Sequence, residues 1–201
     1  MTRILTLSGS PIKNSSTEFL LAEIGRGIAE SSPARPVNEL VRLNDLQYIP
    51  CQACGKSPDP EYCFFHDGLY PVYDTLINCD IVLFGSPVYF DSVSAQAKAF
   101  IDRCNCLCPP DFEGLTGHHF KRILTKKRLG AMALVGGERG EFECARKVIA
   151  GFFKWTEIEN CGKIFYAGSD WKEAGPVRRD TAKLQEAFQL GQLLYSRLNS
   201  I

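Results

Sequence analysis

Short apolar runs alternate with amphipathic stretches along the whole chain. The apolar runs stop at Gly, Ser or Pro, whereas the stretches between them repeat apolar residues at intervals of three and four. Continuous apolar runs are typical of strands buried on both faces of a sheet, and the wider spacing is typical of helices. The pattern predicts strands over 3–7, 37–43, 81–84, 129–135 and 162–167. It predicts helices over 17–30, 69–77, 93–104, 142–153 and 184–198.

This alternation defines the class of fold. Five strands that alternate with five helices predict an α/β, flavodoxin-like three-layer fold with a doubly wound, five-stranded parallel sheet. One such domain accounts for all 201 residues. In this architecture ligands bind beyond the carboxyl ends of the strands, where the strand order reverses. We therefore expect the functional residues in the loops after the first, third and fourth predicted strands.

The charge balance excludes several classes of partner. The 23 Lys and Arg residues match the 23 Asp and Glu residues, so there is no basic surface for nucleic acid or an anionic membrane. No apolar run approaches the roughly 18 residues that a transmembrane helix needs, and the N-terminus has no signal-peptide core. We expect a cytoplasmic protein with neither a nucleic-acid nor a membrane partner.

The loop after the first predicted strand is rich in hydroxyl groups. Residues 8–17 read Ser-Gly-Ser-Pro-Ile-Lys-Asn-Ser-Ser-Thr and lead directly into a predicted helix. Hydroxyls and backbone N–H groups in this position can surround a phosphate at the positive end of the helix dipole. The alternative is an ordinary helix N-cap, for which Ser and Thr are also preferred. The loop matches neither the nucleoside triphosphate nor the dinucleotide glycine motif. Its one cation, Lys13, among neutral hydroxyl donors suits a phosphate monoester.

An aromatic pair follows the third predicted strand. Residues 85–91 read Gly-Ser-Pro-Val-Tyr-Phe-Asp. A planar ring ligand needs flat apolar contacts together with backbone donors and acceptors at its edge. Pro87 restricts the backbone, and Tyr89 and Phe90 supply flat surfaces. The alternative is that both aromatic side chains only pack beneath a loop.

Together these two loops and the following Gln96-Ala-Lys-Ala-Phe-Ile-Asp-Arg103 resemble the NADPH-dependent FMN reductase family of flavodoxin-like flavoproteins. The resemblance covers residues 3–104 and recurs at 134–137. It implies that the FMN phosphate is bound by Ser10, Lys13, Ser15, Ser16 and Thr17. It implies that the isoalloxazine ring is lined by Pro87, Val88, Tyr89 and Phe90, with the backbone of Gly136 and Gly137 at its pyrimidine edge.

The resemblance also implies an activity. FMN takes a hydride from NAD(P)H and passes electrons to a quinone, flavin, azo compound or similar small-molecule acceptor by a ping-pong route. The family further implies a homodimer or homotetramer, with residues 105–127 as a lid or interface segment. The cofactor supplies the hydride chemistry, and the sequence identifies no catalytic side chain. The three histidines, His66, His118 and His119, form no recognisable triad.

Two other functions stay open. A flavodoxin-type electron carrier would use the same fold, but such carriers are typically acidic and this chain is neutral. A redox sensor would instead use the cysteines of the loop after the second predicted strand. The sequence does not distinguish NADH from NADPH.

Nine cysteines raise the separate question of a metal. Cys51, Cys54 and Cys63 resemble the iron–sulfur flavoprotein branch of the family, in which this loop supplies four thiolates to a [4Fe–4S] cluster. Ser57 stands at the third position here, and such clusters are normally held by four thiolates. A fourth thiolate could come only from Cys104, Cys106 or Cys108, if the fold brings them near. We expect no metal, with a cluster or a zinc ion as alternatives. Cys79, Cys144 and Cys161 are interpreted as small buried side chains.

Overall fold

The computed structural model describes residues 1–54, 62–108, 124–138 and 140–200. Its strands are β1 (Arg3–Ser8), β2 (Val37–Arg42), β3 (Ile81–Tyr89), β4 (Ser92–Val93), β5 (Arg128–Gly136) and β6 (Ile158–Ala167). Its α-helices are α1 (Ser16–Ser31), α2 (Tyr70–Asn78), α3 (Ala95–Arg103), α4 (Glu143–Trp155) and α5 (Thr181–Leu198). Short 3₁₀ helices cover η1 (Leu43–Asp45), η2 (Cys104–Leu107) and η3 (Pro176–Arg179).

The sheet has the strand order β2-β1-β3-β5-β6, and all of these neighbours pair in parallel. With β4 left out, this is the flavodoxin-like order 2-1-3-4-5. The predicted doubly wound fold is therefore confirmed. The sequence did not predict β4, which pairs antiparallel with the end of β3 through Val88 and Val93. Two residues are too few to show a periodicity, so only the hairpin contact defines this strand.

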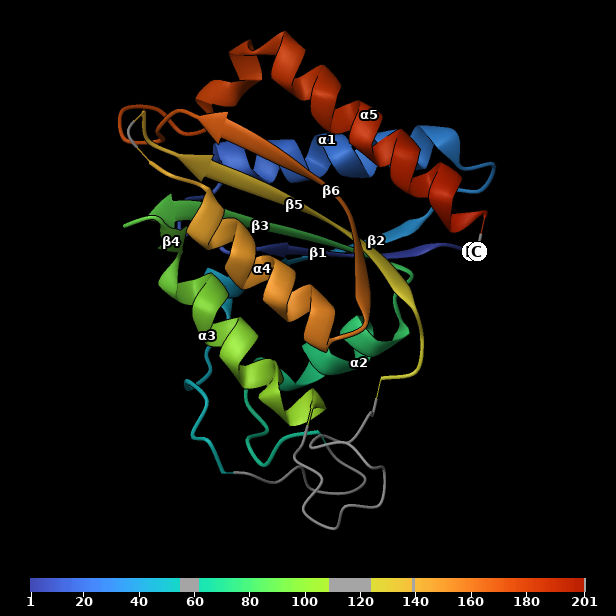
Figure 1. Ribbon diagram of the computed structural model, residues 1–201, viewed down its shortest axis with the longest axis vertical. Helices are drawn as coiled ribbons and strands as arrows, with labels where there is room; N and C mark the ends of the chain where they lie inside the picture. The colour runs from blue at the N-terminus through green and yellow to red at the C-terminus, as the bar shows by residue number, and fades with distance from the viewer. Residues whose placement is uncertain (55–61, 109–123, 139, 201) are drawn as a thin grey trace.

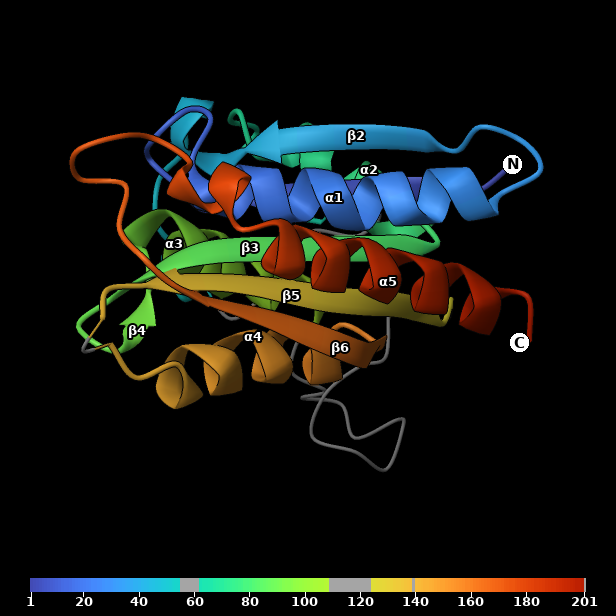
Figure 2. The same cartoon turned by 90° about the horizontal axis from the view of Figure 1, so that it is seen from above.

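Helices cover both faces of the sheet. Figure 1 shows α1 and α5 on one face and α2, α3 and α4 on the other, and Figure 2 shows α1 and α5 lying side by side. Neighbouring strand residues face opposite layers, as Leu83 packs in the core beneath α1 and α5 while Phe84 packs in the core on the other face. This burial on both faces explains the continuous apolar runs. None of the helices in the described ranges is long and apolar enough to cross a bilayer.

The strand β3 is longer than predicted. Its expected end was Phe84, but it continues to Tyr89 and pairs with β5 as far as the partners Pro87 and Val135. The residue before a proline favours extended backbone. The neighbouring strand β1 ends opposite Gly85, so Pro87 lies where β3 has lost one neighbour, a position that tolerates proline.

The last strand also begins earlier than predicted. The strand β6 starts at Ile158, whereas the apolar pattern indicated Gly162. Glu159 and Asn160 are exposed in the structure, and β6 is an edge strand. Polar residues are compatible with a strand at the edge of a sheet. They interrupt the apolar run, so the hydrophobic pattern does not show the first residues of β6.

Candidate functional site

The loop after β1 and the end of β3 meet where the strand order reverses. The Gly9 N–H donates a hydrogen bond to the Gly85 carbonyl at 2.8 Å. Ser94 caps α3 by accepting from the Ala97 N–H, and its hydroxyl donates to the Gly9 carbonyl at 2.7 Å. The predicted phosphate loop and the predicted ring-binding segment are thus joined by hydrogen bonds into one unit.

The hydroxyl-rich loop folds around the N-terminus of α1. Four of the predicted phosphate-binding residues are at most 2% exposed: Ser10, Ser15, Ser16 and Thr17. Ser15 is the N-cap of α1, and its Oγ accepts from the Glu18 N–H. Lys13 differs, because its side chain is 72% exposed and lies 3.8 Å from Asp45. The structure therefore brings the four hydroxyl residues together and leaves Lys13 at the rim.

The Thr17 hydroxyl is the polar group of this loop whose surroundings best suit a bound anion. Its Oγ1 is buried and finds no hydrogen-bond partner in the described part of the chain. An unsatisfied buried hydroxyl costs roughly 1–3 kcal/mol, so such groups are rare without a reason. A phosphate oxygen bound at the N-terminus of α1 would accept this hydrogen bond.

Replacing Thr17 by valine should separate binding from stability. The substitution keeps the shape of the side chain and removes an unsatisfied hydroxyl, so we expect the melting temperature to stay the same or rise. FMN affinity should fall by about tenfold, since a hydrogen bond to a charged group contributes roughly 1.5–3 kcal/mol. A fluorescence titration of the apoprotein with FMN measures the first effect, and thermal unfolding measures the second.

Thr6 supplies the matched control for this substitution. Its buried hydroxyl donates to Asn38 Oδ1 at 2.7 Å, within the sheet and away from the loop. Thr6→Val should lower stability and leave FMN affinity unchanged. Equal FMN affinities of the wild type and Thr17→Val would place the phosphate elsewhere.

Glu18 organises the phosphate loop, although it was not predicted as a site residue. Its carboxylate accepts from the Asn14 N–H at 2.8 Å and from the Ser8 hydroxyl at 3.3 Å, and it is ion-paired with Arg42 at the end of β2. Asn14 has a φ of 54°, a left-handed conformation that these contacts hold in place. The spacing of Ser15 and Glu18 is that of a capping box, a signal that the sequence contained.

A carboxylate from the C-terminal part of the chain also reaches this loop. Asp170, in the loop after β6, accepts from the Ser16 N–H at 3.2 Å, from the Ser16 hydroxyl at 3.0 Å and from the Gly175 N–H at 2.8 Å. Both donors of Ser16 are thereby engaged by a carboxylate. No local pattern in the sequence could have shown this contact, because its partners are 154 residues apart.

The predicted ring-binding segment lies at the end of β3. Val88 is buried, whereas Tyr89 is 44% exposed and Phe90 is fully exposed. Phe90 and Asp91 both have positive φ, 50° and 58°, and form the two-residue turn between β3 and β4. Burial, together with the nearby Asp170 carboxylate, raises the pKa of the Tyr89 phenol, which therefore stays protonated at neutral pH.

The end of β5 adjoins this segment. A methyl group added to Gly136 would lie 3.6 Å from the Val88 Cβ, whereas one added to Gly137 would meet no atom within 4 Å. Asp91 Oδ1 accepts from the Glu141 N–H at 3.0 Å and joins the β3–β4 turn to the loop after β5. The structure thus brings Val88 and Gly136 together and leaves open space beside Gly137.

A family model described as NADPH-dependent FMN reductase matches residues 2–172, a range that includes both loops and the end of β5. The chain belongs to the NADPH-dependent FMN reductase family. Its members are FMN-dependent oxidoreductases, and this protein is one of them. The hydroxyl-lined N-terminus of α1 suits the phosphate of FMN, and the apolar end of β3 beside the open backbone of Gly137 suits a flat ring. The residue-by-residue contacts stay predictions.

Several known proteins are similar to this FMN reductase family member in sequence or in structure. An iron–sulfur flavoprotein of Methanosarcina thermophila is 25% identical over 99% of this chain and 96% of that protein. An NADH:FMN oxidoreductase structure aligns with 100% of this chain and 92% of its own, at 15% identity and a TM-score of 0.68. A flavone reductase structure aligns with 98% of this chain, which spans 63% of that longer chain, at 15% identity and a TM-score of 0.70. The two structures show the shared fold.

The three cysteines of the loop after η1 differ in exposure. Cys54 is exposed, Cys51 is half-buried and Cys63 is buried. Ser57, at the third position, lies outside the described residues. In the ranges that are described, no three Cys, His, Asp or Glu side chains are grouped as metal ligands.

Arg103 holds the cysteine loop against α3. Its guanidinium is 1% exposed, and Nη1 donates to Asp67 Oδ2 and to the Ile49 carbonyl, both at 2.7 Å. Nη2 donates to Asp67 Oδ1 at 3.2 Å and to the Cys63 sulfur at 3.5 Å. The Cys106 thiol donates to the Arg103 carbonyl at 3.2 Å, so Arg103 links the second cysteine run to Cys63 of this loop.

The thiols of this second run are held in their protonated form. Burial raises the pKa of Cys106 to about 12 and that of Cys108 to about 11, and it raises the pKa of Cys104 well above its usual value. Thiols, unlike thiolates, are poor nucleophiles and poor metal ligands. Burial therefore makes these three thiols less reactive than exposed ones.

The predictions for the remaining cysteines are confirmed only in part. Cys79 is buried as predicted, Cys161 is half-buried, and the prediction for Cys144 is wrong because it is exposed in the first turn of α4. His66 stacks on Tyr70 with 4.2 Å between the ring centroids. His118 and His119 lie outside the described residues, as does most of the predicted lid, residues 105–127.

Purified protein should contain far less iron than a [4Fe–4S] cluster requires. The expected result is the absence of stoichiometric iron and acid-labile sulfide after anaerobic purification, because the loop offers three thiols and clusters normally need four. Ser57→Cys restores the missing cysteine and is the matched control, which should take up iron under the same reconstitution. Four irons per wild-type chain would contradict the prediction.

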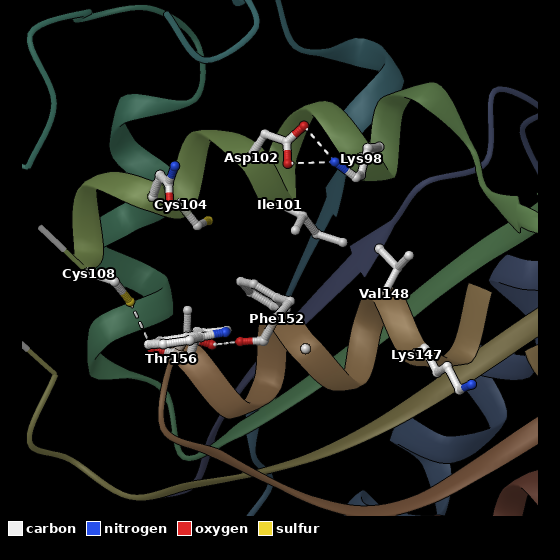
Figure 3. A pocket seen from close by; sticks show the side chains of 12 residues that line it. Lys98, Ile101, Asp102, Cys104, Cys108, Lys147, Val148, Phe152 and Thr156 are labelled. Carbon is white, nitrogen blue, oxygen red and sulfur yellow. Dashed lines mark hydrogen bonds and ion pairs between the residues drawn. The ribbon is translucent and has the colours of Figure 1, made fainter. Parts of the chain in front are cut away.

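A groove between α3 and α4 is lined by none of the predicted flavin-binding residues. It has a volume of about 490 Å³ and an apolar lining that includes Ile101, Val148 and Phe152, and Figure 3 shows these side chains between the two helices. The pair of Lys98 and Asp102 lies at its rim. Because two helices line it, and not the loops after the strands, we assign it no part in flavin binding.

Proposed function

We propose that the protein is an NAD(P)H-dependent FMN oxidoreductase that passes electrons to a quinone, a flavin, an azo compound or a similar small-molecule acceptor. The observation that carries the proposal is the meeting of the hydroxyl-rich loop after β1 with the apolar end of β3. The buried, unpartnered Thr17 hydroxyl lies at the N-terminus of α1, and the Gly9–Gly85 hydrogen bond connects this anion site to an apolar strand end. When bound there, FMN supplies the hydride and electron transfer.

The residues of the chain bind and orient the cofactor in this proposal. The hydroxyls of Ser10, Ser15 and Thr17 surround the phosphate, and Lys13 approaches it from the rim. Pro87 and Val88 support the ring, and the exposed Tyr89 and Phe90 form its outer border. One open ring face that serves the nicotinamide and the acceptor in turn supports a ping-pong route.

The visible absorption spectrum tests the proposal directly. Protein reconstituted with FMN should show flavin bands that bleach after anaerobic addition of NADPH or NADH and return when a quinone is added. Free FMN at the same concentration is the control for uncatalysed reduction. Parallel lines in double-reciprocal plots of steady-state rates would support the ping-pong route.

Other outcomes of this test would contradict the proposal. Bound FMN that neither nicotinamide reduces would indicate an electron carrier of the flavodoxin type. Activity that depends on the oxidation state of Cys51, Cys54 or Cys63 would indicate a thiol sensor. A protein that takes up no FMN would reject the cofactor site.

We also propose that two or four copies associate. Trp155 is 54% exposed at the end of the groove between α3 and α4, and an exposed apolar surface of this kind is commonly covered by association. Light scattering after size-exclusion chromatography should give a multiple of the chain mass of 22.4 kDa. A single-chain mass at micromolar concentration would contradict this.

A further inference from the structure

The loop after β6 lies directly on the predicted phosphate loop. Gly175 in this loop has a φ of 69°, and a methyl group there would lie 2.7 Å from the Asn14 carbonyl oxygen and 2.5 Å from the Phe19 ring. Gly175 and Asp170 therefore lie directly against the start of α1. Any group bound at the N-terminus of α1 has this loop as a neighbour.

Asp170 engages donors that a phosphate at this place would use. Ser16 is the first residue of α1, so its N–H is one of the groups that the helix leaves without a carbonyl partner. Both Asp170 carboxylate oxygens lie within 3.3 Å of this nitrogen, and Oδ1 is also 3.0 Å from the Ser16 hydroxyl. A carboxylate at a helix N-terminus is favoured by the same dipole that favours a phosphate.

The charge of Asp170 is not neutralised by a neighbouring cation. No Lys or Arg within the described ranges forms an ion pair with it, and its hydrogen bonds come from Ser16 and Gly175. By contrast, the Glu18 carboxylate in the same loop is paired with Arg42. A flavin phosphate would therefore approach an unpaired negative charge as well as the Thr17 hydroxyl.

We propose that Asp170 determines how strongly this site favours FMN over riboflavin, by competing with the flavin phosphate for Ser16. The inference rests on the proposed function, because it requires the phosphate to lie at the N-terminus of α1. Riboflavin lacks the phosphate and makes no such contact, so the competition lowers the affinity for FMN alone. Asp170 is thus a specificity residue that lies outside the loop after β1.

The substitution Asp170→Asn tests this competition. It removes the charge and keeps an oxygen that can accept from Ser16. Titration of the apoproteins with each flavin should show an FMN Kd that is lower by at least about tenfold in Asp170→Asn, because repulsion between two nearby charges is lost. The riboflavin Kd should change by less than about twofold, and the gain for FMN should shrink as salt screens the charges.

Asp180→Asn is the matched control. Asp180 caps α5 and accepts from the Lys183 N–H at 2.9 Å, so the same charge is removed from another helix N-terminus. This variant should leave the ratio of the two flavin affinities unchanged. Equal changes for FMN and riboflavin in Asp170→Asn, or a weaker affinity for FMN, would overturn the proposal and show that Asp170 only supports the loop.

A titration with inorganic phosphate distinguishes an error in the role of Asp170 from an error in the proposed function. In Trp155→Phe, Trp171 is the one remaining tryptophan, and it is 90% exposed in the same loop as Asp170. Phosphate should change its emission at a lower concentration when Asp170→Asn is added to that background. Flavin that binds to none of the proteins would reject the proposed function, whereas equal phosphate titrations in the two backgrounds would reject the role of Asp170.

Discussion

Replacement of Arg103 by methionine should lower the free energy of unfolding by about 3–5 kcal/mol at neutral pH, the usual effect of breaking a buried ion pair. The guanidinium of Arg103 is 1% exposed and bonds both carboxylate oxygens of Asp67. Removing it leaves Asp67 without its charged partner and the Ile49 carbonyl without a donor. Urea denaturation at constant temperature measures the effect.

The stability lost in Arg103→Met should depend on pH. Burial alone would raise the pKa of Asp67, but the hydrogen bonds from Arg103 and from the Leu69 N–H outweigh it and hold that pKa below its usual value. A carboxyl whose pKa is lower in the folded protein stabilises it above the unfolded-state pKa of about 3.9. This contribution is lost as pH falls through the folded-state pKa. The difference between the wild type and Arg103→Met should therefore shrink below about pH 4.

Arg128 is the matched control for this pH dependence. It is also 1% exposed, and it donates to the carbonyl oxygens of Leu76 and Thr156. Carbonyl oxygens do not titrate, and the Glu157 carboxylate acts on Arg128 without a hydrogen bond in the described contacts, so the destabilisation by Arg128→Met should depend less on pH than that by Arg103→Met. Parallel pH profiles for Arg103→Met and Arg128→Met would contradict the importance of the Arg103–Asp67 pair.

Gly191→Ala should destabilise the protein by about 3 kcal/mol or more, at the upper end of the range for overpacked cores. A methyl group on Gly191 in α5 would lie 2.0 Å from the Ile24 carbonyl oxygen and 2.9 Å from the Ile28 nitrogen, both in α1. These are backbone atoms, so no side-chain rotation can make room and the two helices must move apart. Gly27 in α1 also has no room for a side chain, because a methyl group there would lie 2.1 Å from the Phe188 carbonyl oxygen.

Gly151→Ala should have the opposite effect and raise the free energy of unfolding. Gly151 lies inside α4 on the wall of the groove, and a methyl there would meet no atom within 4 Å. Alanine favours a helix interior over glycine by about 0.5–1 kcal/mol, so we expect a gain of that size. Urea denaturation of both variants gives the comparison. Equal effects of Gly151→Ala and Gly191→Ala would contradict the close contact of α1 and α5.

The order and type of the main elements could be predicted because hydrophobic periodicity is a local property. A run such as 81–84 must be buried on both faces whatever its neighbours are, and alternation of such runs with helices leaves few sheet topologies. The hydroxyls before α1 could be predicted to lie together for the same reason, since adjacent residues at one helix start cannot separate. The aromatic pair at Tyr89 and Phe90 could be placed at the same edge because it follows a strand.

Contacts between distant segments were decided by the tertiary structure alone. Periodicity shows that a residue is buried but does not show which residue it meets. The Asp170 contact with Ser16 and the Arg103 contact with Asp67 join segments that approach only after the sheet and helices have packed. The same holds for β4, which exists through its pairing with β3, and for Pro87, which a strand accepts only where β1 has ended. The sequence by itself determined the order and type of the main elements, because periodicity is local, and the packed structure decided which charged groups lie beside the loop after β1.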